Sequence, residues 1–284
     1  MARLVKSDQQ AETQRMSIQK VAVIGSGVMG SGIAAQIANA GLPVLFYDIQ
    51  SPQAVIDRMA AQGPSGPFMD PARASLLEPL SLETDLSRLA EADWICEVIV
   101  EDLNVKRSLY EKIEKIRKPQ AILSSNTSTI PLSQLIEGRE ETFRQHFVIT
   151  HFFNPPRQMR LLEFVTGPET LPSAAATMSR FCEETLGKGV VPCFDRPGFI
   201  ANRIGVFSIL AVMHHTQAFG LGFDEVDALT GPKIGRPKSA TYRTADVVGL
   251  DTLAHVVKTM QDTLPNDPWH AYFTNPAWLQ ALIA

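Results

Sequence analysis

Short runs of hydrophobic residues dominate the first two thirds of the chain, and each has the length of a buried strand. Stretches with helical periodicity separate several of them, for example 26–41 and 104–116. Strands that alternate with helices are typical of a doubly wound, mainly parallel sheet. The predicted strands are 20–25, 43–48, 94–100, 121–126, 147–154, 159–165 and 189–194.

The pattern changes near Arg196, and no strand-like run follows it. Residues 197–219 predict one long buried helix with Pro197 near its start, and further helices follow. We therefore predict an α/β Rossmann-type doubly wound, mainly parallel sheet, followed by an all-α C-terminal domain. The predicted parts are a loose polar tail over 1–18, the α/β domain over 19–196 and the helical domain over 197–284.

Composition and charge narrow the classes of partner. The chain has 284 residues, is 45% hydrophobic and carries a net charge of −4, so it can form two cores but offers no basic surface for nucleic acid. Its longest apolar run, near 204–213, is too short to span a membrane. Cys96, Cys182 and Cys193 are scattered without metal-binding spacing, which predicts reduced thiols and no metal site. We expect a cytoplasmic protein, with the mitochondrial matrix as the alternative.

A glycine-rich turn joins the first predicted strand to the first predicted helix. Gly25, Gly27 and Gly30 have the spacing G-x-G-x-x-G, and Asp48 ends the next strand. In this context the spacing predicts a dinucleotide site, because glycines permit a tight turn, close approach of a pyrophosphate and packing of the helix on the sheet. The carboxylate of Asp48 would accept hydrogen bonds from the ribose and repel a 2′-phosphate, so we predict NAD as the cofactor and not NADP. The complete predicted turn is Gly25, Ser26, Gly27, Val28, Met29 and Gly30.

The segment THFFNPPRQMRLLEF, residues 150–164, holds a histidine and a carboxylate in largely apolar surroundings. His151 could be a buried structural histidine or one half of an acid–base pair with Glu163. Histidine suits proton transfer because its side chain titrates near neutral pH, and a carboxylate on the other ring nitrogen fixes the tautomer. The two residues can meet only if their strands converge, which the sequence leaves open.

Five motifs follow one another in a distinctive order: VAVIGSGVMGSGIA, EVIVEDLNVK, SSNTS, HFFNP with LLEF, and PGFIANR. In this order they resemble the NAD-dependent L-3-hydroxyacyl-CoA dehydrogenases, and the similarity extends from Val21 to Val256. The segment 229–252 is most similar to the dehydrogenase part of bacterial fusion proteins in which an enoyl-CoA hydratase module follows. The sequence has no such module, so no hydratase activity is expected.

The resemblance implies an enzyme that oxidises (S)-3-hydroxyacyl-CoA to 3-oxoacyl-CoA with NAD in fatty-acid β-oxidation, as a homodimer formed through the helical domain. In this family pattern His151 is the general base and Glu163 orients it. Ser128 and Asn202 match hydrogen-bonding groups around the reacting oxygen. The positions that match contacts to the nicotinamide half of the cofactor are Glu101, Lys106 and Asn154.

Other interpretations remain open at this point. A related dehydrogenase of a small hydroxy acid or sugar acid would have the same cofactor turn, and a non-catalytic NAD-binding or structural homologue would keep the fold alone. Purely structural roles are the alternatives for Ser128 and Asn202. The alternative for Glu101 is a surface carboxylate at a strand end, and the alternative for Lys106 is a solvated helix position.

Two regions depart from the family pattern. Residues 49–92 are shorter than usual and lack a helical hairpin that helps to hold coenzyme A; 61–71 is predicted to be a loop, and Arg58 and Arg73 are the basic residues that remain near it. The chain ends in NPAWLQALIA, where the family continues, so it could be a fragment of a longer protein. The affinity for the coenzyme A portion is therefore left open.

Overall fold

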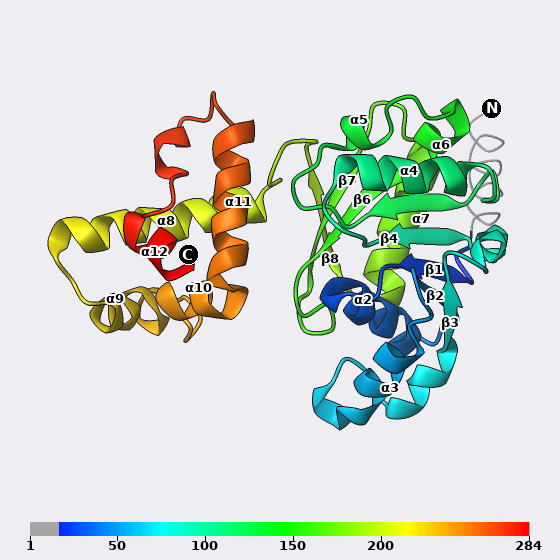
Figure 1. The fold of residues 1–284 in the computed structure, drawn as a ribbon, viewed down its shortest axis with the longest axis horizontal. Coiled ribbons are helices and arrows are strands. Elements are labelled where there is room, and N and C mark those ends of the chain that lie inside the picture. The colour runs from blue at the N-terminus through cyan, green and yellow to red at the C-terminus, as the bar shows by residue number, and fades with distance from the viewer. Residues whose placement is uncertain (1–16, 284) are drawn as a thin grey trace, which may run out of the picture. The chain divides into compact units, whose positions relative to one another are not determined.

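The computed structural model describes residues 17–283 of the chain. Its contacts divide the chain into two compact units, one ending at Asp195 and the other beginning at Arg196 (Figure 1). Most of the predicted tail, residues 1–16, lies outside the described residues. Ile18, which the sequence placed in the tail, is instead buried in the core of the first unit. The backbone N–H groups of Gln19 and Lys20 both donate to the carboxylate of Asp93, which holds this segment against the domain.

The described part of the first unit is built on an eight-stranded sheet in the order β3-β2-β1-β4-β5-β6-β7-β8. Neighbouring strands are parallel except for β6 and β7, which are antiparallel. The predicted fold class is therefore confirmed. The strands are β1 Val21–Ile24, β2 Val44–Asp48, β3 Leu77–Ser81, β4 Trp94–Glu97, β5 Ile122–Ser125, β6 Phe147–Phe152, β7 Leu161–Thr166 and β8 Gly189–Cys193.

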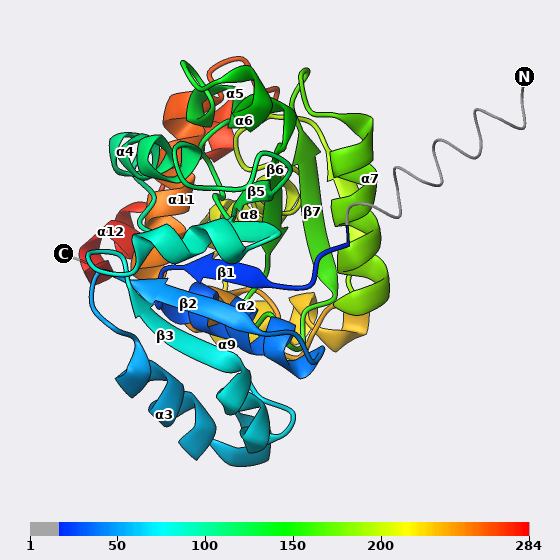
Figure 2. The ribbon, with the colours of Figure 1, turned by 90° about the vertical axis from the view of Figure 1, so that its right-hand side faces the viewer.

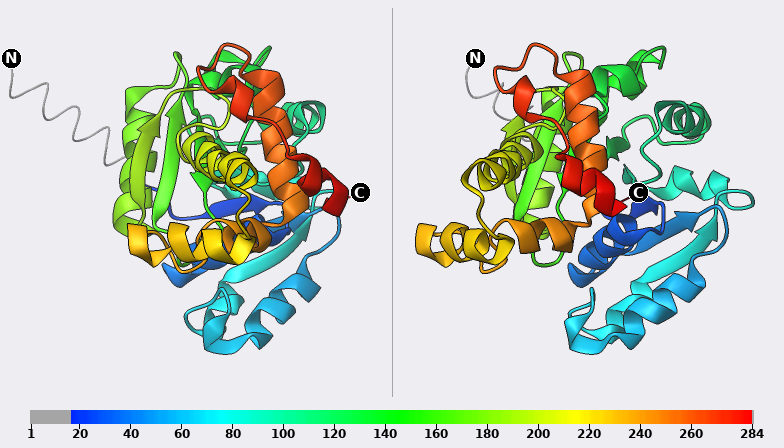
Figure 3. Two further views of the ribbon diagram at one scale, coloured as in Figure 1. Left: turned by 90° about the vertical axis from the view of Figure 1, so that its left-hand side faces the viewer. Right: turned by 60° about the vertical axis from the view of Figure 1, so that its left-hand side comes forward.

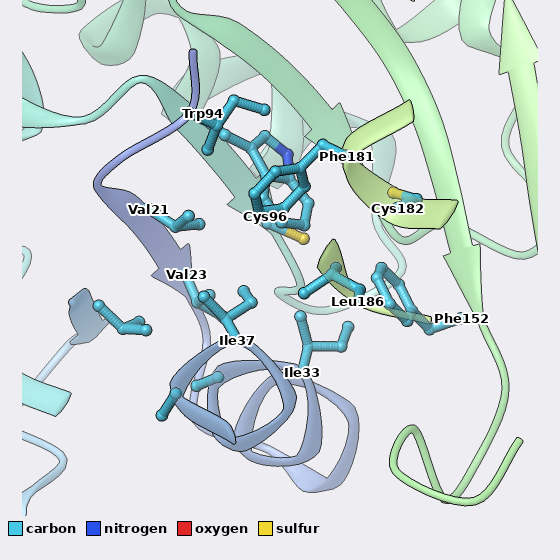
Figure 4. Close-up of a cluster of buried hydrophobic side chains, with 14 of the residues drawn as sticks. Val21, Val23, Ile33, Ile37, Trp94, Cys96, Phe152, Phe181, Cys182 and Leu186 are labelled. Carbon is cyan, nitrogen blue, oxygen red and sulfur yellow. The ribbon is translucent and has the colours of Figure 1, made fainter. Parts of the chain in front are cut away.

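Helices cover both faces of this sheet, with α4 (Leu103–Glu114) and α7 (Pro172–Arg180) on opposite sides (Figure 2). The hydrophobic core on one face includes residues of α2 (Val28–Asn39) and α7. Figure 4 shows Ile33 and Ile37 of α2 and, from the segment that follows α7, Phe181 and Cys182, around the strand residues Trp94 and Cys96. Side chains alternate along a strand, so the next residue, Glu97, faces α4. The remaining helices of this unit are α3 Gln53–Ala61, α5 Leu132–Leu135 and α6 Glu141–Gln145, with short 3-10 or π segments at Gly63–Ser65, Pro71–Leu76, Leu86–Glu91 and Phe181–Thr185.

Over residues 196–283 the regular structure is helical, and α8 and α11 contact each other in its core (Figure 3). The long predicted helix exists, but it begins at Ala201 and not near Pro197. Gly198 and Phe199 both have positive φ angles, +73° and +42°, so the chain turns before the helix can start. The helices are α8 Ala201–Phe219, α9 Phe223–Thr230, α10 Tyr242–Val248, α11 Leu250–Thr263 and α12 Ala277–Ile283, with 3-10 turns at Pro232–Ile234 and His270–Tyr272. Across the described part of the chain, no helix is long and apolar enough to cross a membrane.

Candidate active site

The glycine-rich turn has the geometry that a pyrophosphate requires. Gly25 follows β1 with φ +110°, and a Cβ there would lie 2.5 Å from the carbonyl oxygen of Val98. A Cβ on Gly30 would lie 1.9 Å from the carbonyl oxygen of Gly25, so α2 can pack this closely only with glycine. A Cβ on Gly27, the residue before α2, would meet no atom within 4 Å. The turn is therefore closed towards the protein and open at the start of α2, where unpaired N–H groups attract anions.

Asp48 lies beside this turn at the end of β2. Its carboxylate accepts hydrogen bonds from the backbone N–H of Ser26 and of Ile49, both at 2.7 Å, and from the Ser26 hydroxyl. A cavity of about 510 Å³ adjoins it, with apolar walls that include Leu82 and Leu86. An apolar slot that ends in a carboxylate fits the adenine and ribose of a dinucleotide, so these residues fit the predicted cofactor.

The other two predicted residues of the turn differ in exposure. The side chain of Val28 is 74% exposed at the first residue of α2, whereas Met29 packs against the hydrophobic core. Val28 can therefore meet a bound cofactor with its side chain, whereas part of the Met29 side chain is used in packing.

The strands β6 and β7 bring His151 and Glu163 together. The two residues are directly opposite each other in the antiparallel pair, and both are buried. The Nδ1 atom of His151 lies 2.7 Å from Oε2 of Glu163. A carboxylate on Nδ1 requires an N–H there, which leaves Nε2 as the ring's proton acceptor. The chain reverses between these strands, and this reversal explains why residues twelve apart in sequence meet.

Ser128 completes a row of three polar groups. Its Oγ atom lies 3.0 Å from Nε2 of His151, on the side of the ring opposite Glu163. The arrangement is hydroxyl, imidazole and carboxylate in sequence, and it can move a proton to or from a group placed near Nε2.

Glu101 holds the loop that carries Ser128, residues 126–131, which we call the Ser128 loop. Its Oε1 atom accepts hydrogen bonds from the hydroxyl of Thr127 at 2.6 Å, from the N–H of Ser128 at 3.0 Å and from both the N–H and the hydroxyl of Thr129. Burial acts to raise the pKa of Glu101, but the charge of Lys106 and these hydrogen bonds together hold that pKa below its ordinary value. The structure thus places Glu101 as a fixed anion against the loop that carries Ser128.

Lys106 is buried against two carboxylates. Its side chain is 1% exposed, and its Nζ atom lies 2.6 Å from Oε1 of Glu97 and 3.5 Å from Oε2 of Glu101. An ammonium group enclosed in this way is not a solvated helix position, and contact between Lys106 and the cofactor stays a prediction. The inner face of α4 packs against the end of β4, where two carboxylates compensate the buried charge.

Asn154 and Asn202 belong to different parts of the chain. Asn154 follows β6, precedes a cis peptide bond to Pro155 and lines a second cavity, of about 540 Å³, together with Gly27 and Arg58. Asn154 is therefore close to the cofactor turn. Asn202 lies in the first turn of α8, in the second unit, and its role at the site stays a prediction.

Two polar residues of the site were not identified from the sequence. Asn126 accepts a hydrogen bond from the backbone N–H of Phe152 through Oδ1 at 2.9 Å, which joins the Ser128 loop to the strand of His151. Glu97 is buried beneath the same loop. A charged residue inside a run as apolar as WICEVIV is the signal that could have identified Glu97, because burying a charge requires partners.

Comparison with protein families gives two matches that together cover almost the whole chain. Residues 20–196 match the 3-hydroxyacyl-CoA dehydrogenase NAD binding domain, and residues 198–284 match the 3-hydroxyacyl-CoA dehydrogenase C-terminal domain. The chain belongs to the 3-hydroxyacyl-CoA dehydrogenase family. The prediction of this family, and with it of a dehydrogenase, is confirmed.

Individual relatives agree with the family. A probable 3-hydroxyacyl-CoA dehydrogenase of Deinococcus radiodurans is 49% identical over 261 residues, which cover 89% of this chain and 75% of the relative. A Bacillus subtilis protein of the same name is 44% identical over 272 residues, which cover 88% of this chain and 34% of that protein. The fatty acid oxidation complex subunit alpha of Psychrobacter arcticus is 35% identical, over 88% of this chain and 35% of its own length. The chain thus spans about a third of the length of these two longer relatives.

Solved structures show the same architecture. The crystal structure of Mycobacterium tuberculosis FadB2 matches with a TM-score of 0.83 and 31% identity, over 94% of each chain. The (S)-3-hydroxybutyryl-CoA dehydrogenase PaaH1 of Ralstonia eutropha matches with a TM-score of 0.80 and 25% identity, also over 94% of each chain.

Proposed function

We propose that this chain interconverts (S)-3-hydroxyacyl-CoA and 3-oxoacyl-CoA with NAD, as a step of fatty-acid β-oxidation. One observation carries the proposal: a buried imidazole bridges a carboxylate and a hydroxyl, in the same domain as a dinucleotide cradle. Oxidation of a secondary alcohol requires a hydride acceptor and a base, and these two features supply the binding site of one and the side chain of the other.

The side chains of the protein carry out the proton transfer of this reaction. Nε2 of His151 removes the proton from the substrate hydroxyl, while bound NAD supplies the chemistry of hydride acceptance. The carboxylate of Glu163 keeps the ring oriented and stabilises the imidazolium that forms, as in other acid–base pairs of this type. In the reverse direction the imidazolium returns the proton to the substrate oxygen.

Ser128 acts in this scheme as a hydrogen-bonding group and not as a nucleophile. A serine beside a histidine–carboxylate pair is also the arrangement of acyl-transfer enzymes, which need backbone N–H donors for an oxyanion. The N–H groups of Ser128 and Thr129 already donate to Glu101. With these donors engaged, the Ser128 hydroxyl is better suited to bind the substrate oxygen next to His151.

The cofactor preference follows from Asp48. A carboxylate held by two backbone N–H groups and the Ser26 hydroxyl is fixed where ribose hydroxyls would bind, and its charge opposes a 2′-phosphate. NAD is therefore the proposed cofactor. Glu101 and Asn154 are proposed to lie at its nicotinamide half, and Asn202 is proposed as a further hydrogen-bonding group for the reacting oxygen.

The proposed enzyme is a homodimer located in the cytoplasm. A homodimer through the helical unit is supported by exposed apolar side chains there, among them Phe219 at 73% and Val247 at 83% exposure. A cytoplasmic location is proposed as well.

The test is a substrate panel with purified chain and NADH. Acetoacetyl-CoA should be reduced with loss of NADH absorbance, whereas acetoacetate, which lacks coenzyme A, should not. Reduction of acetoacetate alone, or of other small oxo acids, would favour a hydroxy-acid dehydrogenase. NADH binding without turnover of any of these compounds would favour a non-catalytic homologue.

A further inference from the structure

Glu97 is a buried carboxylate that the proposed reaction has not yet used. It ends β4, its side chain is 1% exposed, and four groups donate to it. These are Nζ of Lys106 at 2.6 Å, the hydroxyl of Tyr110 at 2.6 Å, the hydroxyl of Ser125 at 2.7 Å and the N–H of Ile99 at 2.8 Å. Burial and the nearby Glu97 raise the pKa of the Tyr110 phenol well above its ordinary value, which keeps it a donor.

Such a cluster is costly to bury, and an apolar replacement often stabilises a fold at least as well. The stability of the fold therefore does not explain why Glu97 and its partners are present. Their contacts lead to the Ser128 loop by two separate routes. On the first route, the Ser125 hydroxyl, which donates to Glu97, accepts the N–H of Thr127 at 3.2 Å.

The second route passes through the shared cation. Lys106 is bound closely by Glu97 and lies 3.5 Å from Glu101, and Glu101 accepts the N–H of Ser128 at 3.0 Å. Two carboxylates thus compete for one ammonium group. If Glu97 lost its charge, Lys106 would move towards Glu101, and Glu101 would exchange hydrogen bonds with the loop for a closer ion pair.

The backbone of Glu97 is also placed between the two halves of the site. Its carbonyl oxygen accepts a hydrogen bond from the N–H of Asn126, at the start of the Ser128 loop, at 2.9 Å. The next residue, Val98, donates its N–H to Ile24 at 2.8 Å and limits the space beside Gly25 of the cofactor turn. The end of β4 therefore sets the distance between the cofactor turn and the loop that carries Ser128.

We propose that Glu97 is a positioning residue for the dehydrogenase reaction: with Lys106 it fixes the Ser128 loop so that the Ser128 hydroxyl stays beside Nε2 of His151, where it can bind the substrate oxygen. This inference rests on the proposed function. Glu97 acts through Ser128 and touches neither substrate nor cofactor. Small displacements of such a loop are expensive, since a misplacement of about 1 Å can cost about 100-fold in rate.

The test compares Glu97→Gln with Asp93→Asn. Asp93 directly precedes the same strand at its other end and is also bound by a lysine and two N–H groups: Lys118 at 2.6 Å, Gln19 at 2.9 Å and Lys20 at 3.0 Å. Both substitutions keep the side-chain shape and remove one charge. Glu97→Gln should lower kcat with acetoacetyl-CoA by between about tenfold and about 100-fold, with the Kd for NADH unchanged. Asp93→Asn should leave kcat unchanged.

The decisive readout is additivity. If Glu97 acts through Ser128, adding Glu97→Gln to Ser128→Ala should not lower kcat further, because coupled residues give non-additive effects. Losses that multiply would overturn the inference, and so would equal losses of kcat in the Glu97→Gln and Asp93→Asn proteins.

A structural measurement separates this inference from the proposed function. A crystal structure of the Glu97→Gln protein should show the Ser128 hydroxyl displaced from His151 Nε2, to which it is now 3.0 Å. An unchanged distance would overturn the inference whether or not the native chain turns over. An inactive native chain would overturn the proposed function, and displacement of Ser128 in the variant would still support the positioning role.

Discussion

Replacing Glu163 with Gln removes one charge from the proposed acid–base pair and almost no volume. The carboxylate is buried and lies 2.7 Å from Nδ1 of His151. It is needed most when the ring is protonated, which happens as the substrate loses its proton. The amide can still accept the Nδ1 proton, so the ring can stay in place while the charge is lost.

The expected loss follows from that geometry. A hydrogen bond to a charged group contributes about 1.5–3 kcal/mol, and two unit charges about 4 Å apart attract by about 4 kcal/mol at an effective dielectric constant of about 20. Because about 1.4 kcal/mol corresponds to a tenfold change in rate, we expect Glu163→Gln to lower kcat by between about tenfold and about 10³-fold. An amide that donates to Nδ1 would select the wrong tautomer and push the loss towards the upper limit.

The assay is steady-state reduction of acetoacetyl-CoA by NADH, with NADH binding measured separately by fluorescence titration. Glu169→Gln is the matched control, because Glu169 is a carboxylate beyond the end of β7 that pairs with Arg144 at the surface. It should retain native kcat, and both variants should bind NADH normally. A Glu163→Gln protein with kcat within about threefold of the native value would refute the charge-stabilisation argument.

Three further predictions follow from the cofactor turn and from Glu101. Asp48→Ala should weaken NADH binding by about 10- to 100-fold, which corresponds to the loss of one hydrogen bond to a charged group. It should also reduce the preference for NADH over NADPH, and an unchanged ratio of the two affinities in binding titrations would contradict this. Gly30→Ala should lower the melting temperature because its Cβ would meet the Gly25 carbonyl at 1.9 Å, whereas Gly27→Ala should fold normally and lose only NADH affinity. Glu101 has a lowered pKa in the folded protein, so its charge stabilises the fold above about pH 4.5 and this contribution is lost as the pH falls. Urea unfolding should show the stability of the native protein approaching that of Glu101→Gln as the pH falls below about 4.5, and a pH-independent difference in stability would exclude this contribution.

Most of the sheet could be predicted from the sequence because buried parallel strands are continuous apolar runs. Strand β3 could not, since its segment, Leu77–Ser81, buries only two of its five residues and contains Pro79. It lies at the edge of the sheet, where one side needs no hydrogen-bond partner and a proline is tolerated. Edge strands of this kind lack the pattern that identifies central strands.

The start of α8 shows a second limit of periodicity. The apolar pattern extends back to Pro197, but the backbone of Gly198 and Phe199 has positive φ. Hydrophobic periodicity reports which side chains are buried and does not report backbone conformation. Phe199 is indeed buried, at 4% exposure, in a turn and not in a helix.

The sequence identified candidate residues for the site but not the contacts between them. The pairing of His151 with Glu163 depends on the antiparallel register of β6 and β7, which the sequence does not specify. The sequence contains a weak indication that Lys106 is buried, because Lys106 shares a helical face with Tyr110 and Ile113, at spacings of four and seven residues. A lysine on such a face requires an anionic partner, and that partner, Glu97, comes from a separate element.

The measurement that tests the central claim most directly is NADH consumption with acetoacetyl-CoA by the native chain and by His151→Ala, with NADH binding titrated for both. The account predicts turnover by the native chain, a loss of about 10²- to 10⁴-fold in the variant, and equal NADH affinity. Near-native turnover by His151→Ala would contradict the assignment of the base. A native chain that binds NADH and reduces no 3-oxoacyl-CoA would contradict the proposed reaction itself.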